Sequence, residues 1–202
     1  LKNTVAKISH RGPDNQGVYS KNKVGMGHAR LSIIDLSDNA NQPFESIDQN
    51  YKIIFNGEIY NFLEIKTELL KNGIKFRTSS DTEVLLNSFI YWGEKCIKKL
   101  NGMFAFVIYD IKKNEVFVGR DRFGVKPLYY LNKYNKIIFS SEIKAIIDYI
   151  PRVEINKQSI HDYFVFQNLL NNKTFFNDVH IFPHGCFSKF KLKKNNSIQI
   201  KK

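Results

Sequence analysis

The stretch "YKIIFNGEIYNF", residues 51–62, places an amide, a glycine and an acid in succession. Asn56 and Gly57 separate two strand-like runs, and this dipeptide is the strongest short signal for a hairpin turn because both residues tolerate positive φ. A side-chain amide beside a free backbone N–H can also supply two donors to an oxyanion. Glu58 adds a carboxylate. The sequence predicts a turn here and leaves open whether the turn also binds a ligand.

Two more charged residues, Arg30 and Asp81, lie at positions where a charged side chain is expected to have a polar or charged partner. Arg30 lies at a strand position among apolar neighbours in "GHARLSIID", and its planar guanidinium suits a carboxylate. On spacing alone, an ion pair with Asp35 explains Arg30 better than a ligand does. Asp81 in "SSDTE" lies at a helix start, where a capping carboxylate is the simpler interpretation and ammonium binding is the alternative.

Other polar clusters favour structural roles. "RDRFGVKPLYY" (120–130) fits a strand connection, and "FSSEIKAI" (139–146) fits a helix start. The five histidines lack metal-ligand spacing, so no metal site is predicted. Cys96 and Cys186 also lack it, and so few cysteines suit a reducing cytoplasm.

The composition narrows the class of protein. The 202 residues are 43% hydrophobic and 14% aromatic, which is enough for one domain with a proper core. No apolar run approaches the ~18 residues of a membrane span, and the first residues lack the apolar stretch of a signal peptide. The net charge of +12 comes mostly from scattered lysines without a nucleic-acid motif. We therefore expect a cytoplasmic protein without nucleic-acid or membrane partners.

Strands and helices are predicted in blocks. Helical spacing over 1–9 ends at the loop "HRGPD" (10–14). Asn61 is expected to cap the helix that follows it, and Ser80 with Glu83 fits a capping box at the start of the next helix. The strands are expected at 17–20, 24–34 and 51–55, in hairpins over 103–121 and 127–142, and at 186–192 and 197–200; the helices are expected at 62–73, 80–93, 94–100, 142–150 and 156–167. Such blocks favour antiparallel sheets covered by helices, an α+β layered sandwich, over a doubly wound nucleotide-binding fold.

The motifs "HRGPD", "GHARLSIIDLS", "QPF", "FNGEIYNF", "SDTEVLL", "LNGMFAFVIYD", "RDRFGVKPLYY" and "FSSEIKAI" occur in this order. Together they resemble the glutaminase domain of glutamine-hydrolysing asparagine synthetases, a class II, N-terminal-nucleophile glutamine amidotransferase. The resemblance implies a four-layer αββα sandwich of two antiparallel sheets, the N-terminal-nucleophile hydrolase fold, lacking its first strand. The amidotransferase domain would span 1–188. Residues 189–202 would end the domain or begin a linker to an ATP-dependent synthetase domain.

The resemblance also implies roles for individual residues. Arg30, with the backbone of Leu31, Ser32, Ile33 and Ile34, would hold the α-carboxylate of L-glutamine. Glu58 and Asp81 would hold its α-ammonium group, and the Asn56 side chain and Gly57 N–H would form the oxyanion hole. No cofactor is expected in this domain; ATP and Mg²⁺ would belong to the synthetase domain, a partner within the parent chain. A homodimer is left open.

The chain departs from the family at both ends. The family begins Met-Cys-Gly and uses that cysteine as nucleophile, with its own α-amino group as base, whereas His10 here follows only nine residues. Neither Cys96 nor Cys186 carries a free α-amine. We therefore expect an inactive, N-terminally truncated chain that still binds glutamine. It has no S-G-G-L-D-S loop for pyrophosphate, so it is not expected to adenylate aspartate. The alternatives are a glutamine amidotransferase of a surface-polysaccharide sugar pathway and a non-catalytic glutamine-binding domain.

Overall fold

The computed structural model describes residues 1–21, 23–192 and 198–202. Its helices are short, and most lie where the apolar spacing predicts them. The α-helices are α1 (Lys2–Ala6), α2 (Phe62–Lys71), α3 (Asp81–Trp92), α4 (Lys144–Ile147) and α5 (Lys157–Phe166), and the 3₁₀-helices are η1 (Ser9–Arg11), η2 (Asp38–Ala40) and η3 (Gly93–Lys99). No helix among the described residues is long and apolar enough to cross a membrane.

Three antiparallel sheets make up the β structure. The largest has the strand order β11 (Ile200–Lys201), β10 (Phe187–Lys191), β6 (Glu115–Arg120), β5 (Gly102–Asp110), β4 (Tyr51–Ile59) and β3 (Phe44–Glu45). The second pairs β1 (Asn15–Lys21) with β2 (Val24–Arg30), and the third has the order β8 (Lys136–Ser140), β7 (Tyr129–Lys133) and β9 (Val179–Ile181). Both predicted hairpins are present, as β5–β6 and β7–β8.

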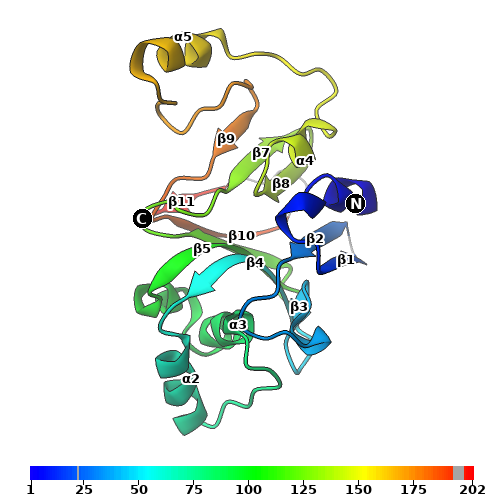
Figure 1. Ribbon diagram of the computed structural model, residues 1–202, viewed down its shortest axis with the longest axis vertical. Helices are drawn as coiled ribbons and strands as arrows, with labels where there is room; N and C mark the ends of the chain where they lie inside the picture. The colour runs from blue at the N-terminus through cyan, green and yellow to red at the C-terminus, as the bar shows by residue number, and fades with distance from the viewer. Residues whose placement is uncertain (22, 193–197) are drawn as a thin grey trace.

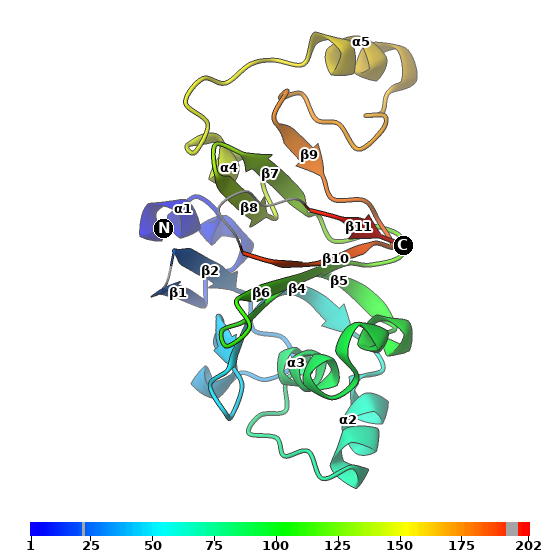
Figure 2. The ribbon, with the colours of Figure 1, turned by 180° about the vertical axis from the view of Figure 1, so that it is seen from behind.

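The elements stack in four layers (Figures 1 and 2). Helices α2 and α3 cover one face of the six-stranded sheet, and the two smaller sheets lie on its other face, with α1 and α4 outside them. Three buried clusters fill the three spaces between the layers. The predicted α+β sandwich with antiparallel sheets is therefore confirmed, with its second β layer divided between the β1–β2 and β8–β7–β9 sheets.

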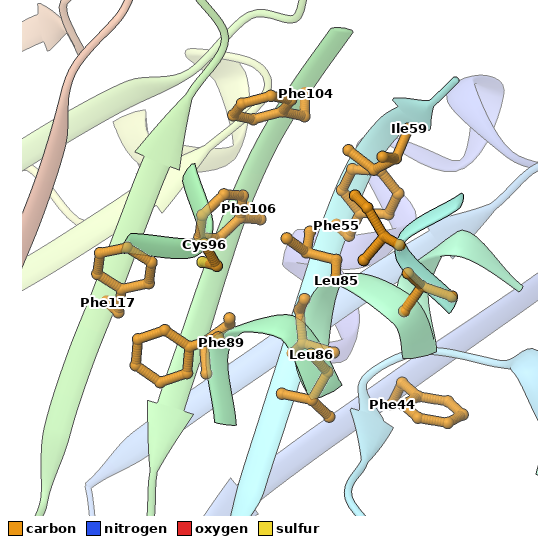
Figure 3. Packing of buried hydrophobic residues seen from close by; sticks show 14 of the residues in the cluster. Phe44, Phe55, Ile59, Leu85, Leu86, Phe89, Cys96, Phe104, Phe106 and Phe117 are labelled. Carbon is orange, nitrogen blue, oxygen red and sulfur yellow. The ribbon is translucent and has the colours of Figure 1, made fainter. Parts of the chain in front are cut away.

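The largest cluster joins α3 to the six-stranded sheet. Leu85, Leu86 and Phe89 of α3 meet phenylalanines of β4, β5 and β6 (Figure 3). Side chains alternate along a strand, so the odd-numbered Phe55 and Ile59 of β4 point to this cluster. The even-numbered residues of β4 point to the opposite face, toward the second β layer. This alternation determines which face each polar residue of β4 occupies.

The predicted turn at Asn56-Gly57 is wrong. β4 runs unbroken over both residues, and Gly57 pairs with Phe104 of β5. Gly57 does not have a positive φ; a Cβ added to it would lie 2.2 Å from the carbonyl oxygen of Met103. The glycine is therefore required by the close approach of a neighbouring strand, a use of glycine that looks the same as a turn in the sequence.

Two other local predictions need correction. Asn61 is the N-cap residue of α2, but its side chain makes no capping bond and instead pairs with backbone at Lys99 and Asn101. Ser80 does cap α3, accepting from the N–H of Glu83. The Glu83 carboxylate does not complete the capping box; it accepts from backbone N–H groups at Arg77 and Thr78.

At the second β layer and the end of the chain, the boundaries shift. The strand expected over 24–34 ends at Arg30, and β9 and the two-residue β3 had no sequence signal. The last expected strand, 197–200, is only partly covered, because residue 197 lies outside the described residues, and β11 occupies Ile200–Lys201.

Candidate functional site

A cavity of about 250 Å³ opens where the end of β2, the outer edge of β4 and the start of α3 meet. Its lining includes all but one of the predicted site residues, namely Arg30, Leu31, Ile33, Ile34, Asn56, Gly57, Glu58 and Asp81. The exception is Ser32, whose backbone N–H donates to Asp14. Residues from three separate parts of the sequence are thus brought to one site.

Arg30 enters this cavity as a buried cation, with 7% of its surface exposed. Its Nη1 donates to the carbonyl of Ser37 at 2.8 Å and to Oδ1 of Asn41 at 2.7 Å, and its Nη2 donates to the carbonyl of Asp35. These acceptors are all neutral, and no ion pair to Arg30 is found within the described ranges. The Nε–H and one Nη2 hydrogen remain, so the guanidinium is positioned to bind an anion.

The predicted ion pair between Arg30 and the Asp35 carboxylate does not form. That carboxylate instead accepts from the hydroxyl and backbone N–H groups of Ser37 and Ser79. These bonds, led by the Ser37 hydroxyl, hold the pKa of Asp35 well below its usual range. A carboxylate with so many donors of its own does not need the guanidinium, and only the Asp35 backbone contacts Arg30.

Asp81 and Glu58 add two acids to the lining of the cavity. Asp81 is the first residue of α3, with 6% of its surface exposed, and its Oδ2 accepts the N–H of Ile59 at 3.0 Å. Burial raises the pKa of Asp81 to about 6; the N–H groups of Ile59 and Thr82 oppose this shift, and the charge of Glu58 adds to it. A bound cation would favour the ionised carboxylate and so oppose the rise in pKa that burial and Glu58 cause.

The edge of β4 presents one free donor between two that are occupied. Backbone N–H groups of Phe55, Gly57 and Ile59 point away from β5, because alternate residues of a strand face the same neighbour. Phe55 donates to Oε1 of Gln42 at 2.6 Å and Ile59 donates to Asp81, whereas the N–H of Gly57 finds no acceptor in the part of the chain that the structure describes. Gly57 therefore offers a backbone donor to the cavity.

The neighbouring Asn56 amide points to the second β layer. Its Nδ2 donates to the hydroxyl of Ser141 at 3.2 Å, which leaves one amide hydrogen free. Asn56 and Gly57 thus supply two donors from adjacent residues, the arrangement that an oxyanion requires. The turn predicted for this dipeptide is wrong, whereas its role as an oxyanion hole stays a prediction with which these two donors are compatible.

Sequence reasoning missed three polar residues at this site. Gln42 and His28 contact the backbone of Phe55, and Ser141 accepts from the Asn56 amide; all three lie within the quoted motifs, but the sequence did not indicate these contacts. Burial lowers the pKa of His28 to about 4, so its ring is neutral at pH 7. Its Nε2 carries the proton, because the Phe55 carbonyl 3.1 Å away can only accept. Nδ1 is buried without a partner among the described residues.

Neither cysteine belongs to this cavity. Cys96 is fully buried in the cluster beneath α3 (Figure 3), and burial raises the pKa of its thiol to about 12. Cys186 packs against the cluster between the β layers, and burial raises its pKa also. Both are therefore thiols at neutral pH and far poorer nucleophiles than a thiolate. Across residues 1–21, 23–192 and 198–202, no group of three His, Cys, Asp or Glu residues could hold a metal ion.

Comparisons with known proteins agree with the geometry. A model of the family described as "glutamine amidotransferase domain" matches residues 1–200. Glutamine-hydrolyzing asparagine synthetase 1 of Bacillus subtilis (strain 168) is 39% identical over 201 residues, covering 100% of this chain and 31% of the relative. A putative glutamine-hydrolyzing asparagine synthetase 2 of Methanocaldococcus jannaschii is 41% identical over 178 residues, covering 78% of this chain and 34% of the relative. The chain thus spans about a third of these curated relatives.

Solved structures extend the likeness to the fold. Glutamine phosphoribosylpyrophosphate amidotransferase of B. subtilis superposes with a TM-score of 0.61 at 21% identity, covering 90% of this chain and 35% of that one. At this identity the likeness concerns the fold alone, and it confirms the sandwich of N-terminal-nucleophile hydrolases. With a family match over residues 1–200 and relatives near 40% identity, the chain belongs to the glutamine amidotransferase domain family.

Proposed function

We propose that this chain is the glutaminase domain of a glutamine-hydrolysing asparagine synthetase. The observation that carries the proposal is the charge pattern of the cavity, where a buried guanidinium paired only with neutral oxygens faces a buried acid of raised pKa. An α-amino acid in its zwitterionic form neutralises both. Arg30 holds the α-carboxylate, and Asp81 with Glu58 holds the α-ammonium group.

Leu31, Ser32, Ile33 and Ile34 follow Arg30 and are assigned to the carboxylate through their backbone. Three of the four line the cavity, whereas the Ser32 N–H is occupied by Asp14, so the support for Ser32 is the weakest.

The carboxamide of glutamine would then lie at the edge of β4. A thiolate attacks its carbon to give a tetrahedral oxyanion, which the Asn56 amide and the Gly57 N–H stabilise. The proton that the thiol gave up passes to the amide nitrogen, and collapse of this intermediate then releases ammonia and leaves a glutamyl thioester, which water hydrolyses. We assign the thiolate to a cysteine outside residues 1–202, since Cys96 and Cys186 lie in other parts of the fold.

The ammonia is assigned to a synthetase domain of the parent protein. That domain would use ATP and Mg²⁺ to activate aspartate, and ammonia would complete asparagine. The support is the set of relatives, which are named asparagine synthetases and of which this chain spans about a third.

The test uses the full-length parent protein with L-glutamine labelled with ¹⁵N at its amide. We expect the label in asparagine when aspartate and ATP are supplied. Arg30→Met should lower glutamine-dependent synthesis by about 100-fold or more, because it removes the carboxylate partner, while synthesis from added ammonia continues. Label in an aminated sugar instead of asparagine would favour the polysaccharide alternative. Binding of glutamine without release of its amide would favour a non-catalytic domain.

The 202-residue chain gives a second test. We expect it to bind L-glutamine through Arg30 and Asp81 but to release no ammonia from it. Turnover by this chain alone would contradict the assignment of the nucleophile.

A further inference from the structure

The pairing between β3 and β4 ends at Ile53, three residues before Asn56. Phe44 pairs with Ile53, so the residue in register opposite Phe55 is Gln42. Backbone pairing does not continue to that position. Instead, the Gln42 side chain accepts the Phe55 N–H through Oε1 at 2.6 Å and donates to the Phe55 carbonyl through Nε2 at 3.3 Å. Its amide thus occupies the place that a peptide group of a neighbouring strand would take.

The orientation of this amide follows from its partners. The N–H of Phe55 can only donate, so it requires the oxygen of the amide, and the nitrogen then faces the carbonyl. The same Nε2 donates to the hydroxyl of Thr82 at 3.3 Å. Thr82 follows Asp81 in the first turn of α3. One buried side chain, 7% exposed, therefore joins the edge of β4 to the helix that carries the ammonium-binding acid.

His28 supports the same peptide group from β2. Its Nε2–H donates to the Phe55 carbonyl, so this carbonyl accepts from two side chains. The N–H of Gly57, two residues further along the edge, stays free. If the backbone pairing of β3 continued along β4 past Phe55, it would occupy the N–H of Gly57 as well. A side chain that stops at Phe55 satisfies one pair of edge groups and leaves the next one for a ligand.

We propose that Gln42 is a positioning residue for glutamine hydrolysis. It fixes the β4 edge at Phe55 and ties that edge to Thr82, and so sets the placement of the Asn56 and Gly57 donors relative to Asp81. This inference rests on the proposed function of the cavity. It predicts that loss of the Gln42 amide misplaces the oxyanion donors more than it weakens the binding of glutamine.

The test compares variants of the full-length parent protein. Gln42→Met keeps the length and bulk of the side chain and removes all three bonds. We expect its glutamine-dependent kcat to fall by about 10- to 100-fold, since small displacements of catalytic groups have effects of this size. KM for glutamine should change by less than about 3-fold, because the residues that hold the α-substituents are untouched. Asparagine synthesis from added ammonia should be unchanged.

Two further variants guard against a folding defect. Thr82→Val removes only the tie to α3 and should lower kcat/KM by about 3-fold, the value of a single neutral hydrogen bond. Thr174→Val removes a buried hydroxyl that donates to the Val179 carbonyl at 2.7 Å near the three-stranded sheet. This matched control should leave glutamine hydrolysis unchanged. Hydrogen exchange of the segment 51–59 should speed up in Gln42→Met and not in Thr174→Val.

The outcomes separate the two proposals. Unchanged kcat in Gln42→Met, or an equal loss in Thr174→Val, would overturn the positioning role and leave the proposed function intact. Equal losses of the glutamine- and ammonia-dependent reactions would also overturn it, because they would indicate general damage. If Gln42→Met does not fold, Thr82→Val decides, and no loss of kcat/KM in it would overturn the role. A wild-type parent protein that releases no ammonia from glutamine would overturn both proposals.

Discussion

Asp81 and Asp121 are both buried, with 6% and 1% of their surfaces exposed, but their pKa values are shifted in opposite directions. Asp121 accepts four backbone N–H groups, from Phe104 and from three residues of the loop 122–126. Burial alone would raise its pKa, but these bonds outweigh burial and lower it. Asp81 accepts one N–H from a neighbouring strand, and its pKa rises to about 6.

The two regions differ in whether their charged side chains find partners within the fold. The loop around Asp121 is complete within the chain, because every donor that it needs lies within the same fold. Arg120 beside it likewise donates to the carbonyls of Gly124, Lys126 and Phe182. The cavity around Asp81 and Arg30 holds opposite charges that have no counter-ion among the residues that the structure describes. A buried acid with a full set of donors indicates a structural role, whereas an under-satisfied one facing a cavity indicates a ligand.

Of the two aspartates, only Asp81 is expected to affect catalysis strongly. Asp81→Asn should lower glutamine-dependent kcat/KM of the parent protein by at least about 30-fold, equal to about 2 kcal/mol, because the α-ammonium group loses a buried charge. The control Glu64→Gln removes an exposed acid from the first turn of the adjacent helix α2 and should leave activity unchanged. Steady-state kinetics with glutamine gives the comparison. Activity in Asp81→Asn close to wild type would remove the distinction between the two aspartates.

The same substitution at Asp121 should act on stability. Each of its oxygens accepts two N–H groups, so an amide nitrogen in either place leaves two donors unpaired, at about 1–3 kcal/mol each. We therefore expect Asp121→Asn to destabilise the domain by about 2–5 kcal/mol. Asp81→Asn can keep its bond to Ile59 and should not destabilise it. Scanning calorimetry of both variants tests this, and equal melting temperatures would break the comparison.

The pH dependence of stability should separate the two acids further. The folded-state pKa of Asp81 lies near 6, above its value in the unfolded chain, so the folded state binds more protons between about pH 4 and pH 6. Wild type should therefore lose stability relative to Asp81→Asn as pH rises through this window, on the order of 1–3 kcal/mol. Denaturant unfolding at several pH values measures the difference. A constant difference from pH 4 to 7 would contradict the raised pKa.

The sign for Asp121 is the reverse. Its folded-state pKa is lowered, so its contribution to stability is present above the unfolded-state value and is lost as pH falls through the lowered one. The lowered pKa of His28 also makes stability fall as pH falls from about 6.5 to about 4. The comparison with Asp81→Asn cancels both contributions, since they are common to the two proteins.

The smallest effects are expected at the cysteines. Cys96→Ala should cost about 1 kcal/mol of stability, because it removes one buried sulfur from the cluster beneath α3. Cys186→Ala should cost less, because that residue is only half-buried. Neither should slow glutamine hydrolysis by the parent protein. Loss of turnover in either variant with stability retained would place a reacting thiol where we place none.

The sequence predicted most elements because their signals are local. Apolar spacing indicates α2 and α3, and alternation with Lys- and Asn-rich turns indicates the hairpins β5–β6 and β7–β8. The strand β9 was not predicted because its three residues, of which only Val179 is buried, are too few to show a period. The interpretation of Gly57 failed for a different reason. Its neighbour in space, Met103 of β5, is remote in the chain, and no local pattern reveals that a backbone passes there.

The site was predicted through motifs and not through periodicity. Spacing alone favoured structural roles for Arg30 and Asp81, and the resemblance to a family reversed that preference. The structure adds a physical reason, since both charges are buried without a counter-ion in the described part of the chain. The role of Gln42 could not be predicted from the sequence, because a side chain that takes the place of a paired strand is recognised only once the register of β3 and β4 is known.

Asp81 is partly protonated in the free cavity and should lose its proton when a cationic group binds. Proton release on binding measures this change most directly. Calorimetric titration of the 202-residue chain, which should bind L-glutamine without hydrolysing it, in buffers of different ionisation enthalpy gives the number of protons exchanged on binding. With a pKa near 6 in the free site, we predict release of about half a proton per glutamine at pH 6 and almost none at pH 8. Binding at pH 6 without proton release would contradict the account, because Asp81 would then already be fully ionised.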